Sequence, residues 1–256
     1  MRDQLTLKLD GVSKHFARVD TDDITNALES INLEMHEGEF ISVVGTSGCG
    51  KSTLLRLIAG LIRPTTGTLT VNGEPITGPD PSRGMVFQQP TLFPWLTVEK
   101  NISFSFRMRH KLKGNEEQVQ RILDVIGLTA FKDDYPAQLS GGMAQRVALA
   151  RSLICQPEIL LLDEPLGALD AFTRMSMQDE ILNTWRNTRQ LVVMVTHDID
   201  EAIYMGTKVI VMEPRPGRIM GEIPIALDYP RNRSSSQFVK YRNQILDMLH
   251  FGLKEE

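Results

Sequence analysis

The sequence predicts an α/β fold with a largely parallel sheet. Short apolar runs of strand length recur along the chain, at Phe40–Gly45, Ile159–Asp163 and residues 191–196. Segments with apolar residues at helical spacing lie between these runs. A glycine-rich turn directly follows the first run, as expected where a buried strand passes into a helix. Strands that alternate with helices are typical of a parallel sheet covered by helices.

The first part of the chain predicts strands and one helix. Residues 5–16 and 27–35 alternate well enough for an antiparallel pair. Phe40–Gly45 is the expected central strand, and residues 51–61 the helix after the turn. Further strands are expected over residues 67–72 and 84–87.

The middle of the chain reads as a mostly helical insertion over about residues 92–155, with helical patterns at residues 97–109, 116–127 and 141–154. Strand patterns then return. The later elements expected are strands over residues 159–163, 191–196 and 208–212, and helices over residues 171–186 and 198–205.

The last segment is polar over residues 228–236, which predicts a linker, and amphipathic over residues 238–249, which predicts a helix. We therefore expect one domain over residues 1–227, followed by a linker and helix over residues 228–256.

Composition narrows the class of protein. Hydrophobic residues make up 41% of the chain, and the net charge of −4 lacks the basic excess of a general nucleic-acid binder. The two cysteines form no CxxC pair, so neither a zinc site nor a redox motif is expected. The N-terminus lacks the apolar core of a secretory signal, and no stretch approaches the ~18 uncharged apolar residues of a spanning helix. A membrane role is therefore expected to go through a partner.

Residues 45–53 read GTSGCGKST and fit the phosphate-loop pattern G-x-x-x-x-G-K-[ST]. Glycines let backbone N–H groups approach phosphate oxygens, and the following helix presents its positive end. Lys51 is expected to reach the β- and γ-phosphates and Ser52 to ligate Mg²⁺. A chance match in a flexible turn is the alternative, but this loop follows an apolar strand and opens a helix. The nucleotide contacts expected are Gly45, Thr46, Ser47, Gly48, Cys49, Gly50, Lys51, Ser52 and Thr53.

Cys49 occupies a variable position of this loop, where its main-chain N–H is expected to matter more than its sulfur. A helix N-terminus lowers the pKa of a thiol, which would make this cysteine reactive.

Two carboxylates, Asp163 and Glu164, directly follow the four aliphatic residues 159–162. Ligands of open α/β sheets bind at the carboxyl ends of the strands. We expect Asp163 to hold Mg²⁺ and Glu164 to act as general base for the attacking water, a role worth ~10²–10⁴-fold in rate. A strand that merely ends in a solvated acidic turn is the alternative, and the upstream phosphate loop argues against it.

A second anion-binding helix start is expected at residues 139–143, which read LSGGM. One nucleotide rarely needs two such elements from one chain. They fit together if two copies pair head to tail, with residues 45–53 from one copy and Ser140, Gly141 and Gly142 from the other.

LSGG followed by Gln145 and Arg146, ahead of LLLDEP, resembles the nucleotide-binding subunit of ATP-binding cassette (ABC) transporters, over about residues 5–225. The resemblance implies a P-loop NTPase (RecA-like) core with an antiparallel β subdomain and an inserted α-helical subdomain. It also implies ATPase activity with ATP and Mg²⁺, and an interface loop at residues 168–170.

The same resemblance gives roles to three further residues. Phe16 would stack on adenine, Gln88 would bind Mg²⁺ and sense the membrane partner, and His197 would contact the γ-phosphate. Taken singly, Phe16 could be core packing, Gln88 a polar strand end and His197 a structural histidine. Their joint order in the chain favours the functional roles.

Residues 92–98, LFPWLTV, and residues 163–174 resemble importer ATPases for nitrate, sulfonates, taurine and related small solutes, although Leu166 stands where that group usually has Phe. The resemblance implies a second copy or sister ATPase, an integral membrane permease, indirectly a solute-binding protein, and no nucleic acid. It implies a peripheral location on the cytoplasmic side of the cell membrane. Trp95 would lie near the groove for a permease helix, or else pack the helical insertion.

Three other classes of ATP- or GTP-binding protein fit this sequence less well. Soluble cassette ATPases of DNA repair or translation usually carry two cassettes or a long coiled-coil or zinc insertion, and this chain shows neither. Nucleotide kinases and GTPases need neither the LSGG element nor His197. Exporter cassettes are often fused to membrane helices. The sequence therefore favours the ATP-hydrolysing subunit of an importer, with its solute undetermined.

Overall fold

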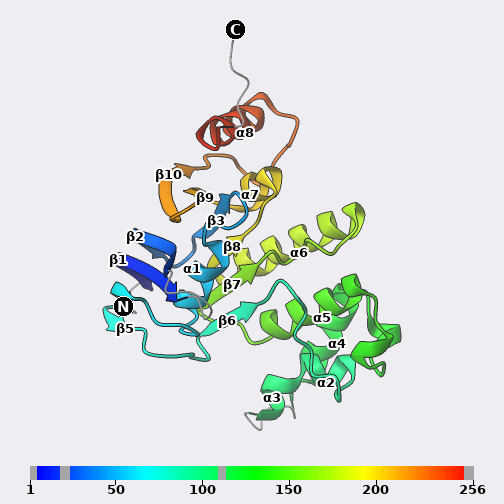
Figure 1. The fold of residues 1–256 in the computed structure, drawn as a ribbon. Coiled ribbons are helices and arrows are strands. Elements are labelled where there is room, and N and C mark those ends of the chain that lie inside the picture. The colour runs from blue at the N-terminus through cyan, green and yellow to red at the C-terminus, as the bar shows by residue number, and fades with distance from the viewer. Residues whose placement is uncertain (1–4, 18–23, 109–113, 251–256) are drawn as a thin grey trace. The chain divides into compact units, whose positions relative to one another are not determined.

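A computed structural model describes residues 5–17, 24–108 and 114–250, which form two compact units. Unit 1 comprises residues 1–80 and 191–256, and unit 2 comprises residues 81–190. The helices and strands of both units are labelled in Figure 1. The expected domain boundary after residue 227 stays a prediction.

Unit 1 contains an antiparallel sheet in the order β2-β1-β4-β5. The expected pairing of the first two strands is confirmed, since Leu7 lies opposite Met35 and both are fully buried. The strands are β1 (Thr6–Ala17), β2 (Ile24–His36), β4 (Thr66–Val71) and β5 (Glu74–Pro75).

A second, largely parallel group of strands in unit 1 has β3 (Phe40–Gly45) between β8 (Leu191–Val195) and β9 (Lys208–Glu213). Every residue of β3 and β8 is buried, as the uninterrupted apolar runs predict. The strand β10 (Arg218–Pro224) pairs antiparallel with β9 and was not expected. Gly221 interrupts its apolar pattern, so the local sequence signal is weak.

Three helices belong to unit 1: α1 (Lys51–Ile58), α7 (Ile199–Met205) and α8 (Ser236–Met248). The helix α1 is shorter than expected because the chain turns at Gly60, where φ is +74° and a Cβ would lie 2.2 Å from the Gly78 carbonyl oxygen. The expected C-terminal helix is confirmed as α8. The hydroxyl of Ser235 caps it by accepting a hydrogen bond from the Phe238 N–H at 3.3 Å.

Unit 2 contains the parallel pair β6 (Arg83–Val86) and β7 (Ile159–Asp163), and helices fill the chain between them (Figure 1). Those helices are α2 (Val98–Ile102), α3 (Phe104–Met108), α4 (Glu116–Val125) and α5 (Gly141–Leu153). The long helix α6 (Ala171–Thr188) follows β7.

The expected single helix over residues 97–109 is wrong over its described part. Thr97 caps α2, and the helix ends at Ser103, where φ is −80° and ψ is 2°. The Ser103 hydroxyl accepts a hydrogen bond from Arg107 Nε at 3.2 Å, a local side-chain interaction of the kind that competes with regular helix. Residue 109 lies outside the described residues.

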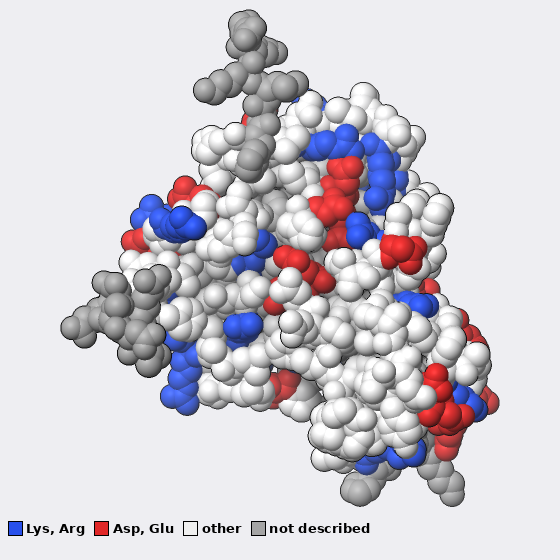
Figure 2. Space-filling model, turned by 45° about the vertical axis from the view of Figure 1, so that its right-hand side comes forward, with Lys and Arg blue, Asp and Glu red and all other residues white. Residues whose placement is uncertain are grey.

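The described residues contain no helix that is both long enough and apolar enough to cross a bilayer. On the face shown in Figure 2, basic and acidic side chains are interspersed among uncharged ones instead of forming one basic surface.

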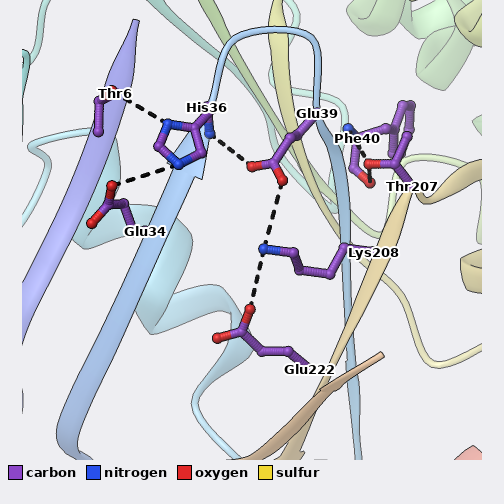
Figure 3. A network of polar contacts seen from close by, with 8 residues as sticks. All are labelled: Thr6, Glu34, His36, Glu39, Phe40, Thr207, Lys208 and Glu222. Atoms are coloured by element: carbon purple, nitrogen blue, oxygen red, sulfur yellow. Dashed lines mark hydrogen bonds and ion pairs between the residues drawn. The ribbon is translucent and has the colours of Figure 1, made fainter. Parts of the chain in front are cut away.

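The amino ends of the parallel strands of unit 1 are joined by a polar network (Figure 3). Lys208, at the start of β9, pairs with Glu39 just before β3 at 3.6 Å and with Glu222 of β10 at 3.2 Å. The Glu39 carboxylate also accepts a hydrogen bond from the His36 N–H at 2.7 Å. This network lies at the edge of the sheet opposite to the carboxyl end of β3, where the glycine-rich loop begins.

Candidate nucleotide site

The phosphate-loop residues leave the carboxyl end of β3 and enter α1, as predicted. The Lys51 ammonium is buried and folds back over the loop. It donates to the carbonyl oxygens of Gly45 at 2.7 Å and Thr46 at 3.1 Å. Each bond joins a charged donor to a backbone acceptor, which makes it stronger than a neutral pair. The loop is therefore held in shape by the cation expected to meet phosphate.

Glycines are required where the loop packs against neighbouring backbone. A Cβ on Gly45 would lie 2.6 Å from the Met212 carbonyl oxygen, and one on Gly50 would lie 2.7 Å from that of Ala27. Gly50 also has φ +90°, which side-chain-bearing residues rarely adopt. Strands β9 and β2 thus fix the two sides of the loop.

Gly217 backs the loop from behind. A Cβ there would lie 2.2 Å from the Cys49 carbonyl oxygen, and the Gly217 N–H donates to Ala27 at 3.2 Å. No local pattern predicts this contact, because residues 49 and 217 are far apart along the chain.

The loop fits a polyphosphate. Ser47 and Gly48 are exposed, and the space beside Gly48 is open. The Thr46 hydroxyl is buried and has no hydrogen-bond partner in the part of the chain that the structure describes. The first turn of α1 carries no acidic residue. An anion with several oxygens would satisfy the hydroxyl and the N–H groups at this helix start.

Cys49 departs from the expectation of a reactive thiol. Its side chain is fully buried, and burial raises the pKa of the thiol, although the Lys51 ammonium 3.7 Å from the sulfur acts in the opposite direction. Desolvation of the thiol outweighs the effect of the Lys51 charge here. The sulfur is buried, and the Cys49 N–H donates to the Thr46 carbonyl oxygen at 3.3 Å.

The other predicted residues of unit 1 are both accessible. The Phe16 ring is 41% exposed near the end of β1, with Lys14 Nζ 5.0 Å from its centroid. An aromatic ring left in solvent fits a stacking role better than core packing. His197 is exposed on the connection between β8 and α7.

Unit 2 holds the carboxylates. Asp163 is buried at the end of β7, and Glu164 follows with φ +46°. A left-handed conformation is uncommon for a residue with a side chain and is often found at functional sites. Gln88 follows β6, and its side-chain amide donates to Glu164 Oε2 at 3.2 Å. The predicted general base and the predicted sensing glutamine therefore touch.

The LSGG element is an exposed helix start, as expected. Ser140 caps α5 by accepting a hydrogen bond from the Met143 N–H at 3.3 Å. The space beside Gly141 is open, whereas a Cβ on Gly142 would lie 3.3 Å from Leu169 Cδ2. The predicted interface loop thus packs against the second glycine and leaves the first one accessible.

A buried strand–loop–helix phosphate cradle, together with two carboxylates at the end of another apolar strand, defines the class of P-loop nucleotide hydrolases. The chain belongs to the ABC transporter family, whose model matches residues 28–167. Within that family it is an ATP-binding subunit, which is an ATPase. The prediction of a cassette ATPase is therefore confirmed.

Curated relatives match nearly the whole chain. The aliphatic sulfonates import ATP-binding protein SsuB of Bacillus cereus is 43% identical over 97% of both chains. An uncharacterized ABC transporter ATP-binding protein of Methanocaldococcus jannaschii is 46% identical over 97% of this chain and 92% of its own.

Solved structures confirm the predicted P-loop fold class. A dimeric post-hydrolysis state of the ATP-binding cassette MJ0796, bound to ADP and Pi, superposes with a TM-score of 0.77 at 33% identity. The match covers 87% of this chain and all of that one. A second dimeric structure of the same cassette gives a TM-score of 0.76.

Proposed function

We propose that this chain binds Mg·ATP on residues 45–53 and hydrolyses it to drive solute import through a membrane permease. The observation that carries the proposal is the phosphate cradle, in which Lys51 donates to two loop carbonyls and the buried Thr46 hydroxyl has no hydrogen-bond partner among the described residues. The fit of these groups to a triphosphate supports ATP as the ligand. Phe16 would supply an exposed ring for the adenine.

Hydrolysis requires a polarised water and neutralised phosphate charge. Glu164 would accept the proton of the attacking water, and the Gln88 amide would hold its carboxylate in place. Lys51 and His197 would donate to the phosphate oxygens. Ser52, Gln88 and Asp163 supply the hydroxyl, amide and carboxylate oxygens that suit Mg²⁺. When bound, that ion neutralises the charge that develops on the phosphates.

A second copy is proposed to complete each nucleotide site. Ser140, Gly141 and Gly142 form an exposed helix start with open space beside Gly141, which supports binding of an anion from another molecule. The solved cassette described above is dimeric. A homodimer is the simplest assembly, because this one chain carries both the phosphate loop and the LSGG element.

The permease is proposed to contact unit 2 near Trp95. This side chain is 69% exposed, although its ring centroid lies 5.6 Å from that of Phe93. Large exposed aromatic side chains are common at docking points for a partner, and Trp95 is supported here by the half-buried Phe93 ring. Such docking would place the chain peripherally on the cytoplasmic side of the membrane, where ATP is available.

The transported solute is proposed to be a small organic anion of the sulfonate type. SsuB of Bacillus cereus, at 43% identity, is named for aliphatic sulfonates. Nitrate and taurine belong to the same group by resemblance. The subunit itself would not touch the solute, so the choice lies with the permease and the solute-binding protein.

Co-purification tests the proposal. The tagged chain is isolated from its own cells in mild detergent, and the proteins that accompany it are identified. We expect a multi-spanning permease, whose purified complex in vesicles hydrolyses ATP and takes up an aliphatic sulfonate. A complex carrying Glu164→Gln should assemble but transport nothing. Recovery only with nucleic-acid machinery would overturn the transport role and leave the ATPase chemistry standing.

A further inference from the structure

The helix α7 begins two residues after His197, and the C-terminal segment of unit 1 holds this helix at both ends. Within unit 1, α8 and the residues before it contact α7 through two arginines, Arg242 and Arg231. Neither arginine belongs to a recognised nucleotide motif. The geometry of these contacts assigns a role to the C-terminal helix.

The amino end of α7 is held by Arg242 of α8. Its Nε donates to Asp200 Oδ1 at 2.5 Å, and its Nη2 donates to Asp200 Oδ2 at 2.6 Å. Two parallel charge-assisted bonds fix both distance and orientation, which a lysine could not do. Asp200 and Asp198 raise the pKa of Arg242, so the fork stays charged at every physiological pH.

His197 lies between two fixed points of the backbone. On the strand side, the Thr196 N–H donates to the Val43 carbonyl oxygen of β3 at 3.2 Å. On the helix side, Asp198 caps α7 by accepting a hydrogen bond from the Glu201 N–H at 3.1 Å. The direction of the His197 side chain therefore depends on where the first turn of α7 lies, and Asp200 is in that turn.

The carboxyl end of α7 is held by Arg231, which is only 6% exposed. Its guanidinium donates to the carbonyl oxygens of Ile203 and Gly206, the latter at 2.6 Å, and lies 4.0 Å from the Tyr229 ring centroid. A cation suits the partial negative charge at a helix carboxyl end. This contact keeps α7 from sliding along its axis.

Apolar packing joins α8 to the strand that carries the phosphate loop. Phe238 and Ile245 of α8 are fully buried in one cluster with Ala202 of α7 and Val44 of β3. Val44 directly precedes Gly45, the first residue of the loop. The helix α8 therefore shares one apolar cluster with α7 and β3, the elements that adjoin His197 and the phosphate loop.

We propose that Arg242 is a positioning residue, which acts through Asp200 and the first turn of α7 to orient His197 toward the γ-phosphate. The inference rests on the proposed function of His197. The inference makes a specific prediction. Loss of the bidentate pair between Arg242 and Asp200 should lower the rate of hydrolysis and leave ATP affinity unchanged, because the phosphate loop itself is intact.

The experiment compares steady-state ATPase kinetics of variants in the purified complex with the permease. For Arg242→Gln and the near-isosteric Asp200→Asn we expect kcat roughly tenfold below wild type, with KM for ATP within about twofold. The charge-reversed pair, Asp200→Arg with Arg242→Asp, should recover part of the rate. Arg242→Lys keeps the charge but loses the fork, and should lie between wild type and Arg242→Gln.

Lys208→Gln is the matched control. It also removes an ion-paired cation of unit 1, but at the opposite edge of the sheet in the network of Figure 3. We expect its kcat to match wild type. If it falls as far as that of Arg242→Gln, the effect is general destabilisation and the inference is overturned.

A double-mutant cycle distinguishes an effect on the orientation of His197 from a general effect on the stability of the fold. In a His197→Ala background, Arg242→Gln should cause no further loss of rate, because the group through which it acts is gone. Additive losses would overturn the inference, as would wild-type kinetics of both Arg242→Gln and Asp200→Asn. Wild-type protein without ATPase activity would instead refute the proposed function. If Arg242→Gln fails to fold, Asp200→Asn replaces it in the cycle with His197→Ala, and the same outcomes support or overturn the inference.

Discussion

The side-chain amide of Gln88 donates a hydrogen bond to Glu164 Oε2 over 3.2 Å. The two residues follow the neighbouring parallel strands β6 and β7. A hydrogen bond to a carboxylate oxygen stabilises its charge and restricts its rotation. Any displacement of Gln88 therefore reaches the proposed general base directly, without an intervening residue.

Glu164→Gln should abolish turnover and spare binding. The amide has the same shape but cannot accept a proton, so we expect ATP hydrolysis to fall ~10²–10⁴-fold while ATP affinity stays within a few-fold. Phosphate release and equilibrium nucleotide binding measure the two quantities. Glu158→Gln, in the exposed residue just before β7, is the control and should behave as wild type. Undiminished hydrolysis by Glu164→Gln would remove Glu164 from its role.

Lys51→Ala should weaken nucleotide binding. Hydrogen bonds to charged groups contribute roughly 1.5–3 kcal/mol, so we expect ATP affinity about 10–100-fold lower by titration. The loop also loses the bonds to Gly45 and Thr46, which adds to the effect. Lys240→Ala removes an exposed cation of α8 and should leave affinity unchanged. Equal ATP affinities for wild type and Lys51→Ala would contradict the proposal that this loop binds the phosphates of ATP.

Ser140→Arg should block the shared site. The bulky cation at the exposed start of α5 would occupy the place of the partner's phosphate, while the phosphate loop of the same chain stays intact. ATP should still bind, but ATP-dependent dimers of the Glu164→Gln protein should disappear in size-exclusion chromatography. Ser234→Arg adds the same side chain at an exposed residue before α8 and should dimerise normally. Normal ATPase activity of the Ser140→Arg protein would count against nucleotide sites that are shared between two copies.

The Cys49 thiol should react slowly at neutral pH. Burial raises its pKa, so less thiolate is present at a given pH than in a free cysteine, and alkylation should accelerate only at a higher pH than it does for a free cysteine. Mass spectrometry of the Cys155→Ser protein treated with iodoacetamide isolates this site. Rapid modification at pH 7 would mean that the helix start, not burial, governs the thiol.

The sequence predicted what local pattern controls. Uninterrupted apolar runs identified β3, β7 and β8, and the spacing of glycine, lysine and serine identified the phosphate loop before α1. Features that depend on contacts between residues far apart in the sequence could not be predicted. The strand β10 has a weak pattern and forms because β9 offers it an edge. The helix start beside Cys49 raised the alternative of a reactive thiol, but the sequence could not reveal that the side chain is buried and that Gly217, far along the chain, lies against its carbonyl oxygen.

The arginine contacts of the C-terminal segment show the same limit. Residues 228–236 read as a polar linker, yet Arg231 within them is buried against the end of α7. Arg242 lies in a segment that the sequence predicts only as an amphipathic helix. Only the fold places Asp200 opposite its guanidinium, so no periodicity or motif could have revealed the pair.

The close approach of Gly217 to Cys49 also orders events during synthesis. A ribosome releases the phosphate loop long before residue 217, so a nascent chain carries all the loop's residues without the strand pair that backs them. Unit 1 is assembled from both ends of the sequence, and its parallel strands pair across a long intervening segment. ATP should therefore find no finished site on a growing chain until residue 217 has left the ribosome.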